Sequence, residues 1–234
     1  MTKMKELIFA AAVAFVLSAS AADNELTLQE KKDGWKLLFD GKTTKGWHSF
    51  GKNTFPEKGW VVKDGVLEVL QGSKAGDIVT DDTYSDFDLA WDWKVEPGGN
   101  NGVKYFVTDD RKQAIGHEYQ MIDDKNGDDH GDIHSTASFY DVLPPDRNKP
   151  LNPPGQWNSS RVLAKGNHVE HWLNGKKVLE YELGSPEVLG AVQKSKFRSV
   201  PGFATRQKGH ILLTYHNDAA SFKNIKIRDL SRDH

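Results

Sequence analysis

The sequence predicts an all-β protein, a single-domain antiparallel β-sandwich with one short helix near residues 186–193. From residue 34 onward, apolar and polar residues alternate with a period of two, which is typical of strands that turn one face towards a core. Clusters of glycine, asparagine and proline separate these runs at short intervals, as turns between neighbouring strands do. Many short strands joined by close turns favour a sandwich over an α/β fold.

Length and composition are those of one folded globular domain. The chain has 234 residues, of which 27% are charged and 37% hydrophobic, so it can bury a core without covalent cross-links. Lys and Arg total 31 against 33 Asp and Glu, and no basic run is present, so we expect no nucleic-acid partner. The absence of cysteine excludes disulfides, thiolate metal ligands and a thiol nucleophile. Seven tryptophans are many for this length, and sugar-binding β-proteins are one class that carries them.

Residues 1–22 have the pattern of a secretory signal peptide. Two lysines precede an apolar run over residues 7–17, and small residues fill positions 18–22. The run is too short to span a bilayer as a helix, and no cysteine follows it for lipid attachment, so we expect no membrane association. We therefore expect an exported protein, periplasmic or secreted, with a lead-in over residues 23–33 and one domain over residues 34–230.

The clearest predicted strand is Asp86–Val95. Five apolar side chains, from Phe87 to Val95, share one face, and the charged residues share the other. That pattern predicts an antiparallel strand with one side in the core. Similar runs lie at residues 35–39, 66–70, 103–107, 118–122, 160–164, 169–173, 178–183, 211–215 and 222–228.

Local signals also predict one hairpin and one helix. Asn174-Gly175 tolerates two positive φ angles, as a type I′ turn between residues 169–173 and 178–183 requires. For the helix, Ser185 can accept the first backbone hydrogen bonds, and Pro186 suits the first helical position. No internal repeat or break in composition divides the chain, which indicates one domain.

The strand over residues 118–122 carries the side chains that best fit a binding or catalytic site. Alternation places Glu118 and Gln120 on one face of the strand and Tyr119 on the other. A carboxylate and an amide on a solvated sheet face could hold a polyol, although a polar exterior strand would look the same. Asp123 needs a β-bulge to join Glu118. Carboxylate pairs about 5 Å apart perform retaining glycoside hydrolysis, and wider pairs perform inverting hydrolysis.

The acidic segment over residues 123–132 does not fit a calcium loop. Its glycine falls at the wrong position for an EF-hand, and no glutamate closes the loop. His130 and His134 add no regular ligand spacing. The sequence also lacks the motifs of phosphate-binding loops, serine hydrolases and zinc proteases. We therefore expect neither a metal nor a cofactor.

Three large side chains near the predicted hairpin have two possible roles. His171 shares the apolar face of its strand, as a hydrogen-bonded core histidine does. Trp157 and Trp172 are either core residues or platforms on which a sugar ring stacks.

Eight short motifs follow one another along nearly the whole chain from residue 34 onward. They are Gly34-Trp-Lys-Leu-Leu-Phe-Asp-Gly-Lys42, Gly46-Trp47, Phe87-Asp-Leu89, Gly98-Gly-Asn-Asn-Gly-Val103, Glu118-Tyr-Gln-Met-Ile-Asp-Asp124, Pro154-Gly-Gln-Trp-Asn158, His171-Trp-Leu-Asn-Gly175 and Phe222-Lys-Asn-Ile-Lys-Ile227. In this order they resemble the 3-keto-disaccharide hydrolase family, whose members are also described as glycosyl hydrolases.

The resemblance implies a concanavalin-like lectin/glucanase jelly roll with its site on a concave sheet. It also implies substrates in which a glucose unit has been oxidised at C3. By the resemblance, the central site residues are Glu118, Gln120 and Asp123. The substrate-binding residues implied around them are Asn101, Lys104, Tyr140, Trp157, Asn158, His171 and His216. Where the family tends to have Gln-x-His-Gly, this sequence has Thr214-Tyr-His216-Asn217.

A ketone at C3 acidifies the proton on C2, so cleavage can begin with proton abstraction. Such a reaction needs a base, a donor for the enolate oxygen and an acid for the leaving oxygen. We assign Glu118 or His134 as base or acid, Asp123 as an orienting residue, and Gln120 and Asn101 as hydroxyl-binding residues.

Two alternatives remain open at this point. One is ordinary retaining glycoside hydrolysis by Glu118 and Asp123. The other is a non-catalytic carbohydrate-binding module, because jelly rolls host both enzymes and binding modules. In each case the expected partner is a carbohydrate.

Overall fold

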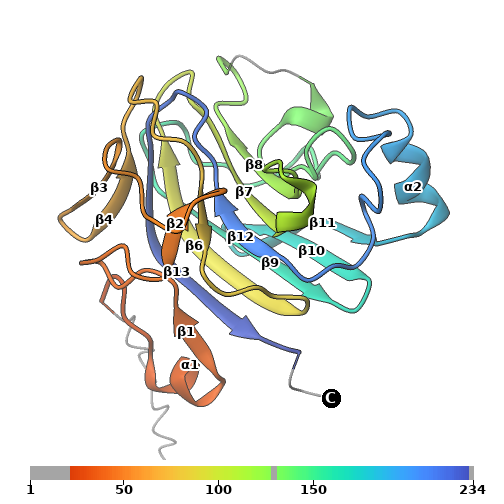
Figure 1. Cartoon of the computed structure of the whole chain (residues 1–234). Coiled ribbons are helices and arrows are strands. Elements are labelled where there is room, and N and C mark those ends of the chain that lie inside the picture. Colours follow the sequence, from red (N-terminus) through yellow and green to blue (C-terminus); the bar gives the residue numbers. More distant parts are fainter. Residues whose placement is uncertain (1–21, 128–130, 232–234) are drawn as a thin grey trace, which may run out of the picture.

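The protein is a sandwich of two antiparallel sheets packed face to face (Figure 1). The computed structural model describes residues 22–127 and 131–231, so the predicted signal peptide lies outside it except for Ala22. The larger sheet has the order β11-β10-β9-β6-β13-β4-β3, with β1 paired to β13. The smaller sheet has the order β2-β5-β12-β7-β8. No helix in the described part of the chain is long and apolar enough to cross a membrane.

The eight-stranded sheet consists of β1 (Trp35–Leu37), β3 (Trp60–Lys63), β4 (Val66–Val69), β6 (Phe87–Val95), β9 (Asn158–Lys165), β10 (His168–Leu173), β11 (Lys176–Glu182) and β13 (Ala220–Asp229). The five-stranded sheet consists of β2 (Trp47–Ser49), β5 (Ile78–Thr80), β7 (Asn100–Val107), β8 (His117–Ile122) and β12 (His210–Leu213). Short helices are α1 (Leu28–Lys32) and α2 (Pro186–Val192), with 3₁₀ turns η1 (Asp109–Arg111) and η2 (Asp132–His134).

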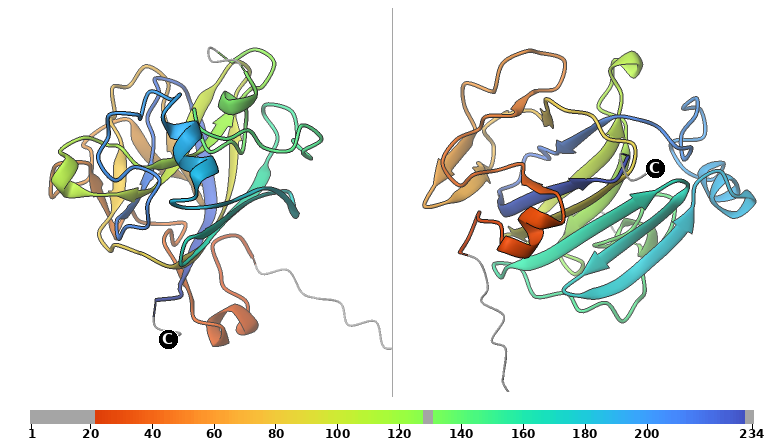
Figure 2. Two further views of the ribbon diagram at one scale, coloured as in Figure 1. Left: turned by 90° about the vertical axis from the view of Figure 1, so that its right-hand side faces the viewer. Right: turned by 90° about the horizontal axis from the view of Figure 1, so that it is seen from below.

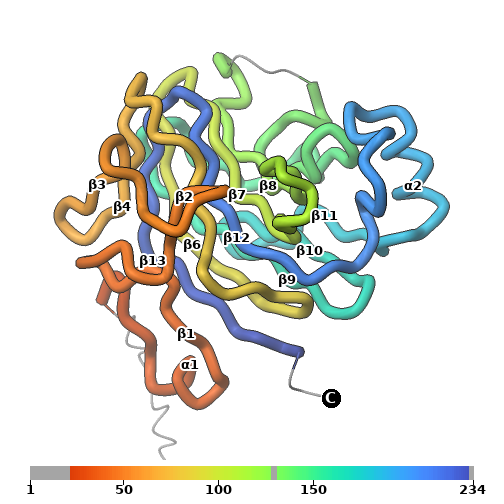
Figure 3. Tube along the Cα trace, viewed as in Figure 1, coloured from red at the N-terminus to blue at the C-terminus, as the bar shows by residue number. Residues whose placement is uncertain are grey.

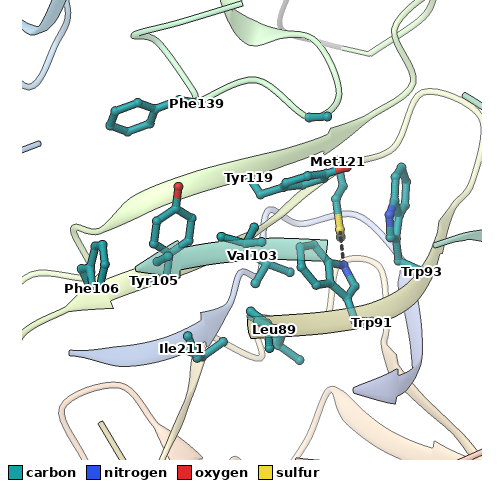
Figure 4. Close-up of a cluster of buried hydrophobic side chains, with 14 of the residues drawn as sticks. Leu89, Trp91, Trp93, Val103, Tyr105, Phe106, Tyr119, Met121, Phe139 and Ile211 are labelled. Carbon is teal, nitrogen blue, oxygen red and sulfur yellow. Dashed lines mark hydrogen bonds between the residues drawn. The ribbon is translucent and has the colours of Figure 1, made fainter. Parts of the chain in front are cut away.

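The core lies between the sheets and is rich in aromatic side chains (Figure 4). Trp91 of β6 is 1% exposed and meets two residues of β8. Its indole nitrogen donates to the sulfur of Met121 at 3.3 Å, and its ring meets Tyr119 edge-on at 5.0 Å. These contacts couple the two sheets and fix which face of β8 points inward.

The predicted β-sandwich is confirmed, and each of the ten predicted runs contains a strand. The sequence pattern missed β2, β3 and β5, which have three or four residues and are too short to show a period of two. The predicted turn at Asn174-Gly175 joins β10 to β11 with φ angles of 45° and 81°, both positive as expected.

The predicted helix near residues 186–193 is confirmed as α2, and Ser185 Oγ accepts from the Val188 amide at 3.2 Å. The expectation of a single helix was wrong, because α1 is a second one. Its five residues are too few to show helical periodicity. The sequence does contain its start signal, a capping box in which Thr27 and Glu30 satisfy each other's backbone amides.

The lead-in to the domain is bound to the eight-stranded sheet (Figure 2). Asn24 and Asn224 form a reciprocal pair, in which each backbone amide donates to the other's side-chain oxygen, at 2.6 and 2.9 Å. Lys223 pairs with Asp23 at 2.8 Å, and Lys226 pairs with Glu30. These contacts hold the residues that precede β1 against β13.

Two histidines are buried in the core as neutral side chains. His171 of β10 bonds the Tyr105 hydroxyl through Nε2 at 2.8 Å and the Ala137 carbonyl through Nδ1 at 2.9 Å. His117 of β8 accepts from the Ala204 amide at 3.0 Å. Burial lowers the pKa of His171 to about 4 and that of His117 to about 3.

Because both histidines stay neutral in the folded state, the free energy of unfolding should fall as the pH drops. In the unfolded chain, both histidines bind a proton below the ordinary histidine pKa of about 6.5. In the native chain they stay unprotonated until the pH reaches about 4 or below. Urea unfolding between about pH 7 and pH 4.5 should show this loss. In the His171→Gln variant, the free energy of unfolding should depend on pH less steeply, by the contribution of about one proton. The same dependence on pH as in the wild type would contradict this prediction.

Candidate active site

Glu118 of β8 and Lys104 of β7 lie opposite each other on the outer face of the five-stranded sheet. Since Tyr119 and Met121 point into the core, Glu118 and Gln120 point outward, as the alternation predicts. The Lys104 ammonium lies 3.8 Å from Glu118 Oε2, and their side chains are 20% and 13% exposed. The structure therefore holds a half-buried carboxylate beside a cation on this face.

Gly102 allows the Glu118 side chain to lie across β7. A Cβ atom at Gly102 would stand 2.2 Å from Glu118 Oε1 and 3.0 Å from its carboxyl carbon. Glycine is required where another group approaches the backbone this closely. Gly102 of the fourth sequence motif thus makes room for the carboxylate of the fifth.

A polar pair continues the outer face beside Gly102. Gln120 donates its side-chain amide to Asn100 Oδ1 at 3.2 Å, and both residues are buried. The sequence motif indicated Asn101 and not Asn100. Asn101 lies opposite Met121, and its amide donates to the Thr214 carbonyl at 3.0 Å. Alternation counted along β7 from Lys104 would have selected Asn100.

The segment after β8 brings His134 and Tyr140 to the same region. The Tyr140 amide donates to the Glu118 carbonyl at 3.0 Å, so this segment runs along the edge of β8. His134 Nε2 bonds Asp141 at 2.8 Å, and its ring stacks on Tyr140 with 4.9 Å between centroids. The Lys196 amide binds the same Asp141 carboxylate, and its ammonium lies 4.1 Å from the Tyr140 ring centre. Asp141 and Lys196 carried no signal in the sequence, because only the folded chain brings them to Tyr140.

A cavity of about 400 Å³ opens beside Glu118. Lys104 and Glu118 line it together with residues 113–116 on the chain before β8 and with Lys196, Phe197 and Val200 after α2. Figure 3 shows the segment after α2, in blue, running back to β12 of the smaller sheet. A carboxylate and ammonium groups around one cavity can exchange protons and stabilise a developing oxyanion.

The structure does not place Asp123 with Glu118. The pairing of β7 with β8 contains no bulge, and Asp123 lies in the turn beyond the strand. Its carboxylate accepts from the amides of Gly98 at 2.9 Å and Lys125 at 3.0 Å and from Asn126, through both backbone and side chain. Burial opposes ionisation of Asp123, but these hydrogen bonds outweigh it and lower the pKa of the carboxyl group. Asp123 therefore braces the turn.

Three other predicted residues also lie away from Glu118. His171 is inside the core, as its apolar strand face indicated. Asn158 is buried, and its side-chain oxygen binds the Asn152 amide and the Asn174 side chain, which pins the proline-rich loop. Trp157 lies on the other side of the sandwich, with the Lys223 ammonium 4.8 Å from its ring centre.

His216 is exposed in the loop between β12 and β13. Asp218 of that loop accepts from the Asn100 amide at 3.1 Å. The loop that carries His216 thus borders the Gln120–Asn100 pair through Asp218.

A family model described as the 3-keto-alpha-glucoside-1,2-lyase-like domain matches residues 34–228. The chain belongs to this family. The resemblance seen in the sequence is thereby confirmed, and the match spans every strand that forms the Glu118 face. Membership makes the chain a glycoside hydrolase-like enzyme.

Similar proteins with known names or structures support membership of the 3-keto-alpha-glucoside-1,2-lyase-like family. A 3-keto-disaccharide hydrolase of Bacteroides thetaiotaomicron is 30% identical, over 94% of this chain and 87% of its own length. A candidate glycosyl hydrolase from Parabacteroides distasonis, solved by crystallography, is 38% identical with a TM-score of 0.81, over 90% of this chain and all of that one. A β-glucanase of Bacillus licheniformis has a TM-score of 0.50 at 10% identity, over 83% of this chain and 96% of its own, which shows the fold alone. The expected concanavalin-like jelly roll is confirmed.

Replacing Gly102 by alanine should displace Glu118 without unfolding the protein. The new methyl group would need Glu118 Oε1 to move by about 1 Å or more to reach ordinary contact, and the end of this side chain can move. A crystal structure of Gly102→Ala should show the shift, with a nearly unchanged Tm. Gly190→Ala, in α2 where nothing lies within 4 Å of the new atom, is the matched control. An unmoved Glu118 would contradict the positioning role of Gly102.

Proposed function

We propose that this enzyme cleaves the glycosidic bond of 3-keto-glucosides or 3-keto-disaccharides on the outer face of the five-stranded sheet. The observation that carries the proposal is the Glu118 carboxylate, held over Gly102 with the Lys104 ammonium 3.8 Å away. The name of the matched family and that of the Bacteroides relative support the substrate class.

The ketone at C3 makes the C2 proton acidic enough for a carboxylate base. Glu118 takes that proton, and Lys104 stabilises the negative charge that develops on the C3 oxygen. The enolate then collapses to a C1–C2 double bond as the C1–O bond breaks. His134, oriented by Asp141 at 2.8 Å, gives a proton to the departing oxygen.

Addition of water completes the hydrolysis. His134 takes a proton from water as its oxygen attacks C1, and Glu118 returns a proton to C2. Both residues regain their starting protonation states, and the net change is one bond hydrolysed. Gln120 and Asn100, which bond each other at 3.2 Å, are the residues of β8 and β7 that we propose to bind sugar hydroxyls.

Retaining hydrolysis by Glu118 and Asp123 fits the geometry less well. That mechanism needs two reactive carboxylates about 5–5.5 Å apart on one sugar. Here the Asp123 carboxylate accepts from Gly98 in the turn between β6 and β7 and from Lys125 and Asn126 in its own turn. The residue lies beyond the end of the strand that carries Glu118. Abstraction at C2 needs only one carboxylate base.

The Glu118→Gln variant should lose turnover while keeping its fold. The amide preserves the volume of the side chain but cannot take a proton, so kcat on a 3-keto-glucoside should fall roughly 10²–10⁴-fold. KM and Tm should change little, because hydroxyl contacts and packing remain. Steady-state kinetics with a parallel melt tests this. A folded variant with unchanged kcat would remove Glu118 from the mechanism.

The Asp123→Asn variant separates the two mechanisms. An amide nitrogen cannot accept the hydrogen bonds of the turn, so the free energy of unfolding should fall by about 1–3 kcal/mol. Well below the melting temperature, kcat on the 3-keto-glucoside should stay close to that of the wild type. The retaining mechanism would be established instead if the wild-type enzyme hydrolyses a plain glucoside and the Asp123→Asn variant, with wild-type stability, has no turnover.

A further inference from the structure

We propose that the protein carries a second saccharide-binding site on the outer face of the eight-stranded sheet, on the other side of the sandwich from Glu118. A cleft of about 560 Å³ lies there between the strands and the N-terminal lead-in, and we call it the outer cleft. Its lining includes Trp172, Arg161, Ala90, Asp92, Ser159 and Lys226. This proposal is independent of the one made for Glu118.

The base of the outer cleft is one row of residues in register across four strands. Trp172 of β10 pairs with Arg161 of β9, which pairs with Ala90 of β6, which pairs with Lys226 of β13. Three inter-strand gaps span about 14 Å, long enough for two linked sugar rings. The small side chain of Ala90 leaves the hollow between the larger ends of the row.

Trp172 is held as a platform at one end of the row. Its indole nitrogen donates to Glu170 at 2.7 Å, and the Arg161 guanidinium lies 5.3 Å from its ring centre. These contacts fix the ring orientation before any ligand arrives. A fixed aromatic side chain with a polar surround is well suited to the C–H surface of a sugar.

Polar groups beside the row are held in place by neighbours yet keep hydrogen-bonding capacity. Arg161 binds Asp88 through Nε at 2.5 Å and Nη2 at 2.9 Å, which leaves the Nη1 donors without a partner among the described residues. Asp92 accepts from Asn224 at one oxygen, at 2.6 Å, and no described residue binds its other oxygen. The Ser159 hydroxyl also has no hydrogen bond within the described chain. Donors and acceptors fixed in this way lower the entropic cost of binding a polyol.

The charge of the lead-in favours a neutral saccharide over an anion. Glu25 and Glu30 line the side of the outer cleft formed by residues before β1, and Asp92 lies in its base. These three carboxylates stand against two cations, Arg161 and Lys226, so the outer cleft has no net positive charge to attract a phosphate or a nucleic acid. Figure 2, in its right-hand view, shows α1 lying beside the strands of the larger sheet, where the Asn24–Asn224 pair holds the lead-in.

The experiment is a calorimetric titration of the full chain with the unmodified disaccharides maltose, cellobiose and sucrose. Trp172→Ala removes the platform, and Ala90→Leu fills the hollow without touching the platform. We expect at least one disaccharide to bind, with Kd raised roughly tenfold or more by each variant. Trp157→Ala is the matched control, because Trp157 lies on the same side of the sandwich but lines no part of the outer cleft. It should leave Kd unchanged.

The outcomes separate this site from the one at Glu118. Glu118→Gln should leave disaccharide binding within about twofold, and Trp172→Ala should leave turnover of a small 3-keto-glucoside unchanged. The proposal is overturned if no disaccharide binds, or if folded Trp172→Ala and Ala90→Leu variants bind as the wild type does. It is also overturned if Glu118→Gln alone abolishes binding. A melting temperature for each variant confirms that it is folded.

Discussion

The packing of β8 against the core is the constraint on which the rest of the structure depends. Tyr119 and Met121 lock onto Trp91 across the sandwich, through an edge-on ring contact and a bond from the indole nitrogen to sulfur. Because successive side chains of a strand point to opposite faces, this lock forces Glu118 and Gln120 outward. A slip of one residue would bury the carboxylate and expose the aromatic ring. The aromatic core therefore selects the face that carries the candidate chemistry.

The same core also supports the segment that borders the site. His171 bonds the Ala137 carbonyl at 2.9 Å, and the Ala137 amide donates to the Gln120 carbonyl at 2.8 Å. Ala137 adopts a positive φ of 69°, which is unfavourable for alanine and is sustained by contacts on both sides. Three residues further on, Tyr140 binds the backbone of Glu118. His171, which belongs to a family motif, thus helps from the core to hold the segment that runs along Glu118.

The sequence predicted what depends on local pattern and failed where distant contacts decide. Period-two alternation was sufficient for the sandwich and for the outward face of Glu118. The same alternation, counted from Lys104, places Asn100 on the outer face of β7. Asn101 was chosen from the motif, although it falls on the opposite face. Trp157 follows a proline-rich loop, and no strand pattern shows which side of the sandwich such a residue meets. Lys196 and Asp141 are 55 positions apart, so their contact exists only in the fold.

The proposed chemistry depends on the separation of Asp123 from Glu118. A double displacement needs a second reactive carboxylate about 5 Å from the first, but the Asp123 carboxylate binds Gly98 of the β6–β7 turn and Asn126 of its own turn. A single base suffices when the substrate itself stabilises the carbanion, as a 3-keto sugar does. What the protein must then add is a positive group near the enolate oxygen and a proton for the leaving group. Lys104 lies 3.8 Å from Glu118, and His134 stacks on Tyr140, whose amide binds the Glu118 carbonyl. We propose these two groups for the two roles, which favours proton abstraction over displacement.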